Sequence, residues 1–346
     1  MDSLEALAAR LDSMRNMNVA VIIVSYRSAN LTIESVRSVD MERASTDVTI
    51  RLVVVDNASG DHPHLVRAIE DNGWGSWVTP ILAPRNGGFA YGNNLGIQKA
   101  FEERTPAYIY LLNPDAQVRP GAIKALVSFL ESNETVGIAG SSFENPDGSD
   151  WPIAFRFPSI VSELCGAVEI GVISRLLERW EVPRRMSRAA QPVDWICGAS
   201  MMIRSKVFDT IGGLDENYFL YFEETDFCRR AREAGFATWY VPASRVMHII
   251  GQSSGLTERA CRPTRLPAYW FESRRRYFAV AFGIPQAILI DLLVILAYPI
   301  GLLKRLALGR AATGIPHFLR DFVRHSALRP CNRLVPAVRG FLPRGR

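Results

Sequence analysis

Apolar residues come along this chain in short, nearly unbroken runs, and the clearest early runs lie at residues 19–24, 51–55 and 108–112. Runs that are apolar on both faces are typical of central parallel strands covered by helices. The segments between them predict helices at about residues 31–39 and 93–103. This alternation predicts a doubly wound α/β fold, in which ligands bind at the carboxyl edge of the sheet.

The second half of the chain contains two further strand-like runs. Residues 194–204 predict a strand with a gap of small residues around Gly198, which leaves room for a ligand to approach. Residues 239–248 predict a late strand that ends in His248. Between the two halves, residues 141–190 give no clear pattern, and either a mobile loop or a solvated surface segment fits them.

Polar side chains follow the first three runs, where a bound ligand would meet the strand ends. They are Ser25, Tyr26, Asp56, Asn57, Asn113 and Asp115. Asp56 is suited to accept a hydrogen bond from a pyrimidine or a ribose hydroxyl, or alternatively to cap a helix. Asp115 ends an Asn-Pro-Asp sequence, which suits either a divalent cation held against a phosphate or a plain β-turn.

A glycine-rich segment at residues 83–96 precedes the predicted helix at 93–103. Its backbone amides and the helix dipole are suited to an anion, and Arg85 adds positive charge beside Gly88. Alternatively, the glycines only allow the helix to pack closely. No GxGxxG fingerprint follows the first run and no Walker lysine loop is present, which argues against a dehydrogenase or a P-loop enzyme.

Three carboxylates crowd the segment after residues 218–222, at Glu223, Glu224 and Asp226. Such crowding is unfavourable unless a cation or a shared proton accommodates it. An exposed acidic helix start is the alternative. His248, taken alone, is more often a structural histidine than a metal ligand.

Composition places the chain among globular proteins, because 48% of its 346 residues are hydrophobic. Its five cysteines are widely spaced, so neither a disulfide framework nor a zinc site is predicted, and a reducing cytoplasm fits. Residues 1–17 lack the apolar core of a signal peptide and predict a short amphipathic helix.

The region after residue 260 is basic and contains an apolar segment at residues 284–303. Asp291 and two prolines weaken a membrane crossing, and basic residues lie on both sides of the segment, so an interfacial helix is favoured over a span. A soluble core helix is the alternative. We expect the arginines before and after it to meet lipid phosphates. These flanking residues are Arg262, Arg265, Arg274, Arg275, Arg276, Lys304, Arg305, Arg310, Arg320 and Arg324.

Four motifs in this order resemble the inverting family 2 glycosyltransferases of GT-A fold, and within them the bacterial rhamnosyltransferases of cell-surface polysaccharide synthesis. They are Val-Ser-Tyr at 24–26, Val-Asp-Asn-Ala-Ser at 55–59, Asn-Gly-Gly-Phe-Ala-Tyr-Gly-Asn-Asn at 86–94 and Leu-Asn-Pro-Asp-Ala at 112–116. The resemblance covers about residues 18–255. It implies a GT-A domain at 18–260, with a helical, membrane-associating region at 261–346.

The resemblance also implies roles for individual residues. Ser25, Tyr26 and Asp56 would line the base and ribose of a nucleotide sugar, and Gly198 its sugar. Asn57, Arg85 and Gly88 would lie near its diphosphate. Asp115 would be the last acid of the family's metal motif, with Asn113 replacing the first acid. Glu224 would be the catalytic base, with Glu223 beside it and Asp226 in reserve. His248 would join Asp115 in binding Mg²⁺ or Mn²⁺.

The sequence therefore predicts an inverting, metal-dependent hexosyltransferase. The expected donor is dTDP-L-rhamnose, and the expected acceptor is a polyprenyl-diphosphate-linked or other glycan. The expected location is the cytoplasmic face of the inner membrane, with no nucleic acid partner. Galactofuranosyl, glucosyl or N-acetylhexosaminyl transfer are alternatives. A sugar nucleotidyltransferase and a non-catalytic binding protein docked on the membrane are more distant ones, and a glycoside hydrolase would have no use for a diphosphate loop.

Overall fold

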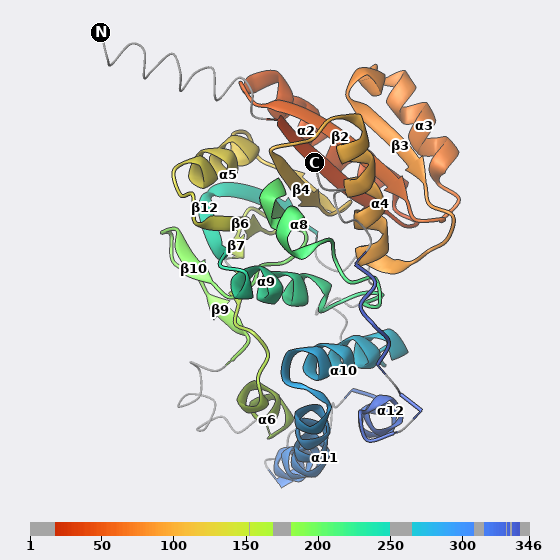
Figure 1. The fold of residues 1–346 in the computed structure, drawn as a ribbon, viewed down its shortest axis with the longest axis vertical. Helices are drawn as coiled ribbons and strands as arrows, with labels where there is room; N and C mark the ends of the chain where they lie inside the picture. Colours follow the sequence, from red (N-terminus) through yellow and green to blue (C-terminus); the bar gives the residue numbers. More distant parts are fainter. Residues whose placement is uncertain are drawn as a thin grey trace.

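The computed structural model of this protein describes residues 18–151, 153–168, 181–249, 265–307, 315–329, 331–332 and 334–339. The helix predicted at residues 1–17 lies outside the described residues. Most of the described chain forms an α/β part, and a layer of helices lies against one end of it (Figure 1).

Within the described residues, ten strands form one mixed sheet and two more form a separate antiparallel two-stranded sheet. The strands are β1 (Asn18–Ser25), β2 (Thr49–Asp56), β3 (Val78–Leu82), β4 (Tyr108–Leu112), β5 (Ala116–Val118), β6 (Val136–Glu144), β7 (Asp150–Trp151), β8 (Ile153–Phe155), β9 (Pro183–Arg185), β10 (Gln191–Val193), β11 (Ser200–Arg204) and β12 (Ala237–His248). The main path of the sheet is β10-β12-β6-β11-β4-β1-β2-β3, with β5 on β12 and β7 on β6. Strands β1 to β4 are parallel, and the antiparallel β11 lies between β4 and β6.

Side chains of β1 alternate between two hydrophobic cores, one on each face of the sheet. Val19, Val21 and Ile23 belong to the core covered by α2 (Ala29–Ser45), α3 (His62–Asp71) and α5 (Ala122–Glu131). Ile22 and Val24 belong to the core covered by α4 (Gly88–Glu103), α8 (Ser205–Ile211) and α9 (Glu223–Glu233). Because both faces are covered, the strand is apolar from Val19 to Val24, as predicted.

A third hydrophobic core lies in the helical layer, which is made by α6 (Ile160–Val168), α10 (Ala268–Phe282), α11 (Ile284–Ala307) and α12 (Phe318–His325). Phe271, Tyr277 and Phe278 of α10 pack there against Ile290 and Val294 of α11. The layer therefore draws α6 from the middle of the chain as well as the C-terminal helices. After α12, residues 334–339 return to the α/β part, where Arg339 bridges to Asp215 (Figure 1).

Two of the arginines before α11, Arg274 and Arg276, do not face a lipid surface as we expected, whereas Arg262 lies outside the described residues. Arg274 is buried and pairs with Asp291 of α11 at 2.6 Å and with Glu163 of α6 at 2.5 Å. Arg276 is also buried and pairs with Asp215 at 2.5 Å. A charged side chain leaves water only where a partner compensates it, so these arginines hold the helical layer together and to the α/β part.

The unreadable segment at residues 141–190 contributes several short elements, namely the end of β6, then β7, β8, α6 and β9. The strand predicted at 194–204 is confirmed only over Ser200–Arg204. Residues 194–199 are irregular, with a turn at Gly198 and Ala199 that leads into β11. The helix predicted at 93–103 begins at Gly88, five residues earlier.

Candidate active site

A cavity of about 540 Å³ lies at the carboxyl ends of β1, β2 and β4, the edge at which the sequence predicted a ligand. Residues from the glycine-rich loop, from the turn before β11 and from the start of α9 complete its walls. The predicted site residues that line this cavity are Tyr26, Asn57, Gly88, Asn113, Gly198, Glu223, Glu224 and His248.

Asn57 fixes the glycine-rich loop against the end of β2. Its side-chain amide donates to the Gly88 carbonyl at 3.0 Å and to Asn86 Oδ1 at 3.1 Å. Gly88 has φ +86°, and a Cβ there would lie 1.9 Å from the carbonyl oxygen of Phe219. Only glycine allows the loop to come this close to the segment before α9.

Three other predicted residues contact other parts of the protein and do not line the cavity. Ser25 is buried and accepts a hydrogen bond from Thr32 at 2.9 Å. Asp56 accepts hydrogen bonds from the backbone and hydroxyl of Ser59 and from the backbone of His62, the first residue of α3. This agrees with the alternative role predicted for Asp56, which was to cap a helix. Arg85 is exposed and lies 4.4 Å from the centre of the Tyr91 ring.

Strand pairing brings Asp115 to His248, although the two are far apart in sequence. β5 pairs antiparallel with β12, so that Ala116 lies opposite His248, and Asp115 Oδ1 is 3.3 Å from His248 Nε2. The rings of Phe143 and Trp151 lie 5.3 and 6.4 Å from the imidazole centre and fix its orientation.

This pair has the chemistry of a cation site. Both carboxylate oxygens of Asp115 and Nδ1 of His248 are buried without a hydrogen-bond partner in the described part of the chain. A buried carboxylate without a partner is costly, and a divalent cation would remove that cost. Among the residues described, no third His, Cys, Asp or Glu completes a metal-binding group, so further ligands would come from a substrate or water.

Glu223 and Glu224 open α9 and place two neighbouring carboxyl groups in the cavity wall. Glu223 is buried, and Glu224 is half-buried with its Oε2 atom inaccessible to solvent. The preceding residues, Tyr221 and Phe222, both have φ +69°. Consecutive non-glycine residues in the left-handed region are strained, and such strain persists only where surrounding contacts enforce it. Here it turns the chain sharply enough to point both glutamates inward.

Burial separates the acidities of the two glutamates. Desolvation raises the pKa of Glu224 to about 7, while N–H groups of Glu224 and Gly198 oppose the rise. The pKa of Glu223 is raised well above its usual value by desolvation and by the charge of Glu224. Glu224 therefore ionises first and Glu223 stays protonated, which makes Glu224 the better proton acceptor near neutral pH.

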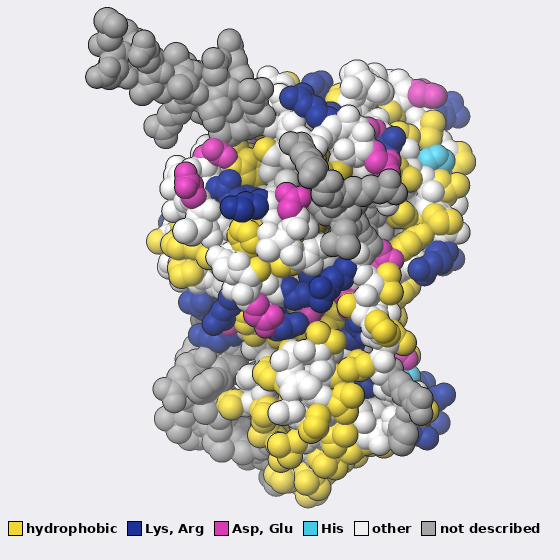
Figure 2. Space-filling model, viewed as in Figure 1, with side chains coloured by type: hydrophobic (Ala, Val, Ile, Leu, Met, Phe, Trp, Pro, Cys, Tyr) yellow, Lys and Arg dark blue, Asp and Glu magenta, His cyan; other side chains and the backbone are white. Residues whose placement is uncertain are grey.

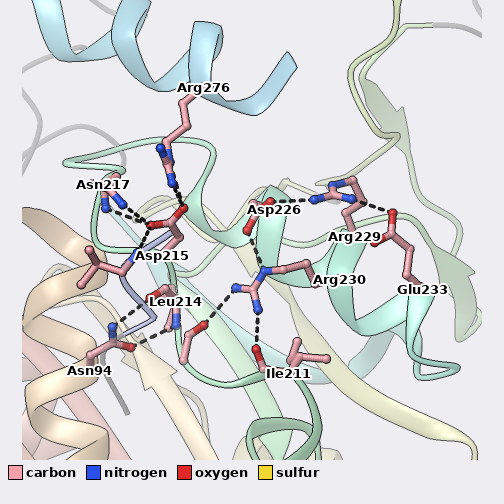
Figure 3. Close-up of polar contacts among 12 residues, drawn as sticks. Asn94, Ile211, Leu214, Asp215, Asn217, Asp226, Arg229, Arg230, Glu233 and Arg276 are labelled. Carbon is pink, nitrogen blue, oxygen red and sulfur yellow. Dashed lines mark hydrogen bonds and ion pairs between the residues drawn. The ribbon is translucent and has the colours of Figure 1, made fainter. Parts of the chain in front are cut away.

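Asp226 does not line the cavity although it is only two residues beyond Glu224, and it lies beside Arg229 and Arg230 (Figure 3). Its carboxylate bonds to Arg230 at 2.8 Å and to Arg229 at 3.0 Å. Arg230 in turn donates to the carbonyls of Ile211 and Gly213. Asp226 thus joins α9 to the segment before it.

The segment between α8 and α9 is held from several sides (Figure 3). Asn94 of α4 exchanges hydrogen bonds with the backbone of Leu214, at 2.9 and 3.0 Å. Asp215 accepts from Arg276 of α10 and from both nitrogens of Asn217. These bonds fix the approach to the two glutamates before their own helix begins.

Sequence reasoning missed several aromatic residues that line the cavity, namely Phe89, Trp151, Phe219, Tyr221 and Tyr269. Phe219 and Tyr221 stand beside the three acids, so their position carried a usable signal. Trp151 lies in the segment without a pattern, and Tyr269 lies in the C-terminal region, where no local feature connects it with a site.

Comparison with known proteins agrees with this geometry. The model of the family "Glycosyltransferase like family 2" matches residues 5–266. An N-acetylglucosaminyl-diphospho-decaprenol L-rhamnosyltransferase of Mycobacterium tuberculosis is 33% identical over 151 residues, which are 43% of this chain and 48% of that protein. The dTDP-rhamnosyl transferase RfbF of Shigella flexneri is 26% identical over 240 residues, 69% of this chain and 71% of that one.

The chain thus matches about half the length of its mycobacterial relative. Among solved structures, GalNAc-T7 with UDP, GalNAc and Mn²⁺ aligns with a TM-score of 0.56 at 14% identity, over 89% of this chain and 54% of that one. This likeness confirms the predicted GT-A fold. The family match, which covers most of the chain, shows that this protein belongs to glycosyltransferase family 2.

Proposed function

We propose that this protein transfers a sugar from a nucleoside diphosphate to an acceptor hydroxyl, with inversion at the anomeric carbon. One observation carries the proposal: Glu224, with a pKa of about 7, lines the same cavity as His248, whose neighbour Asp115 has no hydrogen-bond partner in the described part of the chain. A base and a cation site in one cavity match what an inverting displacement needs.

In the proposed reaction, Glu224 takes the proton of the acceptor hydroxyl. The freed oxygen bonds to the anomeric carbon on the face opposite the diphosphate, and the bond from that carbon to the diphosphate oxygen breaks. Burial supports this role, because a carboxylate with a raised pKa is a stronger base than an exposed one. Glu223, which stays protonated, adds no second negative charge beside the leaving diphosphate.

Asp115 and His248 are the residues that would hold a divalent cation, Mg²⁺ or Mn²⁺. A carboxylate and an imidazole are suitable ligands for such a cation. Asn113 is neutral, so it adds no negative charge that would repel the diphosphate oxygens. When bound, the cation would offset negative charge on the departing diphosphate. Tyr26 and Asn57, at the ends of β1 and β2, would contact the nucleotide, and Ser25 and Asp56 would position them through the loop bonds described above.

We further propose L-rhamnose from dTDP-L-rhamnose as the transferred sugar and a lipid-diphosphate-linked glycan as the acceptor. The names of the relatives from Shigella flexneri and Mycobacterium tuberculosis support this choice. Other hexosyl donors used within the family are the alternative. They would be distinguished by incubating the protein with a panel of nucleotide sugars and measuring the released nucleoside diphosphate.

A lipid-linked acceptor requires the protein to reach a membrane, and we propose that α11 docks it on the cytoplasmic face. The segment Ile284–Leu303 has the length and mean hydropathy of a span. However, Asp291 on its inner face is buried against Arg274, so a crossing would break that pair. The outer face is apolar and exposed, with Leu296 68% accessible, and Figure 2 shows hydrophobic side chains gathered at this end. Such a helix suits the plane of the lipid interface.

Replacing the base tests the mechanism. Glu224→Gln should lower the rate of transfer by about 10²–10⁴-fold, because the amide cannot take a proton, while nucleotide-sugar affinity measured by calorimetry stays nearly unchanged. Glu223→Gln is the matched control, since it exchanges one neutral group for another, and it should lose far less. Equal losses in the two variants would contradict the assignment.

The pH dependence of turnover tests the protonation state. Because Glu224 must be ionised to accept a proton, kcat should rise about tenfold per pH unit below pH 7 and level off above it. The measurement is kcat at saturating donor and acceptor across pH 5 to 9. A rate that levels off already near pH 5 would place the base elsewhere.

The cation site can be tested without catalysis. In Asp115→Ala, binding of Mn²⁺ together with a nucleoside diphosphate should weaken at least tenfold, since one of two protein ligands is lost. Electron paramagnetic resonance of free Mn²⁺ measures this directly. Asp61→Ala, at an acid outside the cavity lining, is the control. Unaltered Mn²⁺ binding in Asp115→Ala would refute the assignment.

The docking face can be tested by co-flotation with vesicles that contain anionic lipid. Replacing Leu292, Leu296 and Ile300 together by Gln should remove most binding, because each exposed side chain would otherwise bury apolar surface in the bilayer. Met41→Gln with Leu82→Gln changes two exposed apolar residues of the α/β part and should still float. Retained flotation of the α11 variant would show that the anchor lies elsewhere.

A further inference from the structure

Three aromatic side chains form one wall of the cavity, and nothing in the proposed mechanism uses them. They are Phe219 and Tyr221, from the segment before α9, and Tyr269, from the first turn of α10. The ring centres of Phe219 and Tyr269 are 5.4 Å apart, and those of Tyr221 and Tyr269 are 6.3 Å apart. We call these three residues the aromatic wall.

The aromatic wall is held firmly in place. The Phe219 carbonyl accepts a hydrogen bond from the Phe89 backbone at 2.8 Å, and the Leu220 carbonyl accepts one from Ser273 of α10 at 3.0 Å. One turn further along α10, Arg276 donates a hydrogen bond to the Asp215 carboxylate (Figure 3). A surface held from two sides, with a strained residue at Tyr221, is preorganised for a ligand.

The chemistry of the aromatic wall differs from that of the rest of the cavity. Polar groups at the ends of β1, β2 and β4, with Asp115 and His248 beside them, suit a nucleotide and its diphosphate. Among the described residues that line the cavity, none is a lysine or an arginine, and the aromatic wall carries no charge. It therefore suits a neutral ring rather than a phosphate. Phe219 remains 37% exposed, so apolar surface is available there.

We propose that the aromatic wall is the subsite that stacks against a pyranose ring of the acceptor glycan. One face of a pyranose presents C–H bonds with slight positive charge, which pack against the negative face of an aromatic ring. The same segment leads directly into Glu223 and Glu224, so a sugar on the aromatic wall has a hydroxyl within reach of the base. This inference rests on the proposed function.

The position of Tyr269 adds a link to the membrane. Gly283 is the only residue between α10 and α11. The helix that contributes Tyr269 is therefore followed directly by the helix that we propose lies on the lipid. The helical layer would thus present both the lipid-facing surface and one side of the acceptor subsite. An acceptor whose lipid stays in the bilayer would meet the aromatic wall with its sugar.

Steady-state kinetics of Tyr269 variants test this inference. The probes are dTDP-L-rhamnose and an N-acetylglucosaminyl diphosphate that carries a short alkyl chain. Tyr269→Leu should raise KM for the acceptor about tenfold, the equivalent of about 1.4 kcal/mol, and leave KM for the donor unchanged. Tyr269→Phe keeps the ring and should retain the original acceptor KM. Tyr298→Leu, which removes a ring stacked on Phe318 in the helical layer, is the control.

Each remaining outcome decides the question. An acceptor KM that stays unchanged in Tyr269→Leu, or a donor KM that rises in its place, would overturn the inference while the proposed function stands. If the unsubstituted protein does not turn over these probes, the proposed function fails, and this inference fails with it. Thermal unfolding of each variant shows whether an effect comes from lost structure, and Tyr269→Phe keeps the test valid if Tyr269→Leu does not fold.

Discussion

Ionising two adjacent carboxyl groups together is unfavourable where they are shielded from water, and this constraint organises the candidate active site. Glu223 and Glu224 share one cavity wall, and the charge of one raises the pKa of the other. The chain holds them there with a strained left-handed turn at Tyr221 and Phe222 and with hydrogen bonds from three helices. The result is one base that can be ionised at neutral pH beside one acid that stays neutral.

The helical layer is part of this arrangement and not an independent attachment. α10 contributes Tyr269 to the cavity, Ser273 to the backbone before α9, and Arg276 to a buried ion pair with Asp215. On its other side, Arg274 joins α10 to α6 and α11. Removing one partner of a buried ion pair typically lowers the free energy of unfolding by about 3–5 kcal/mol. Substitutions in this layer would therefore disturb the position of the residues at the site.

Much of the α/β part could be predicted from the sequence because its strands are buried on both faces and its ligand-binding residues stand at strand ends. The pairing of Asp115 with His248 was reached only through the family resemblance, since it depends on the register of β5 on β12. Their spacing in the sequence alone could not decide whether Glu224 or Asp226 faces the cavity. On a helix, two residues apart means a rotation of about 200°, which sends Asp226 away from the cavity.

The C-terminal region was the least predictable from sequence. Arg274 and Arg276 looked like lipid-facing charges, because sequence does not show that Asp291 and Asp215 fold against them. Tyr269 carried no local signal, because its role arises only when α10 packs beside a loop some fifty residues earlier. Long-range ion pairs and contacts of this kind depend on the tertiary arrangement and not on local periodicity.

The central claim is that Glu224 is the first of the two neighbouring acids to lose its proton, and nuclear magnetic resonance titration of the glutamate side-chain carboxyl carbons tests it most directly. The account predicts one glutamate signal that titrates with a pKa of about 7 and disappears in Glu224→Gln. Its neighbour should remain protonated at that pH. Titration of every glutamate in the ordinary range near pH 4 to 5 would contradict the account.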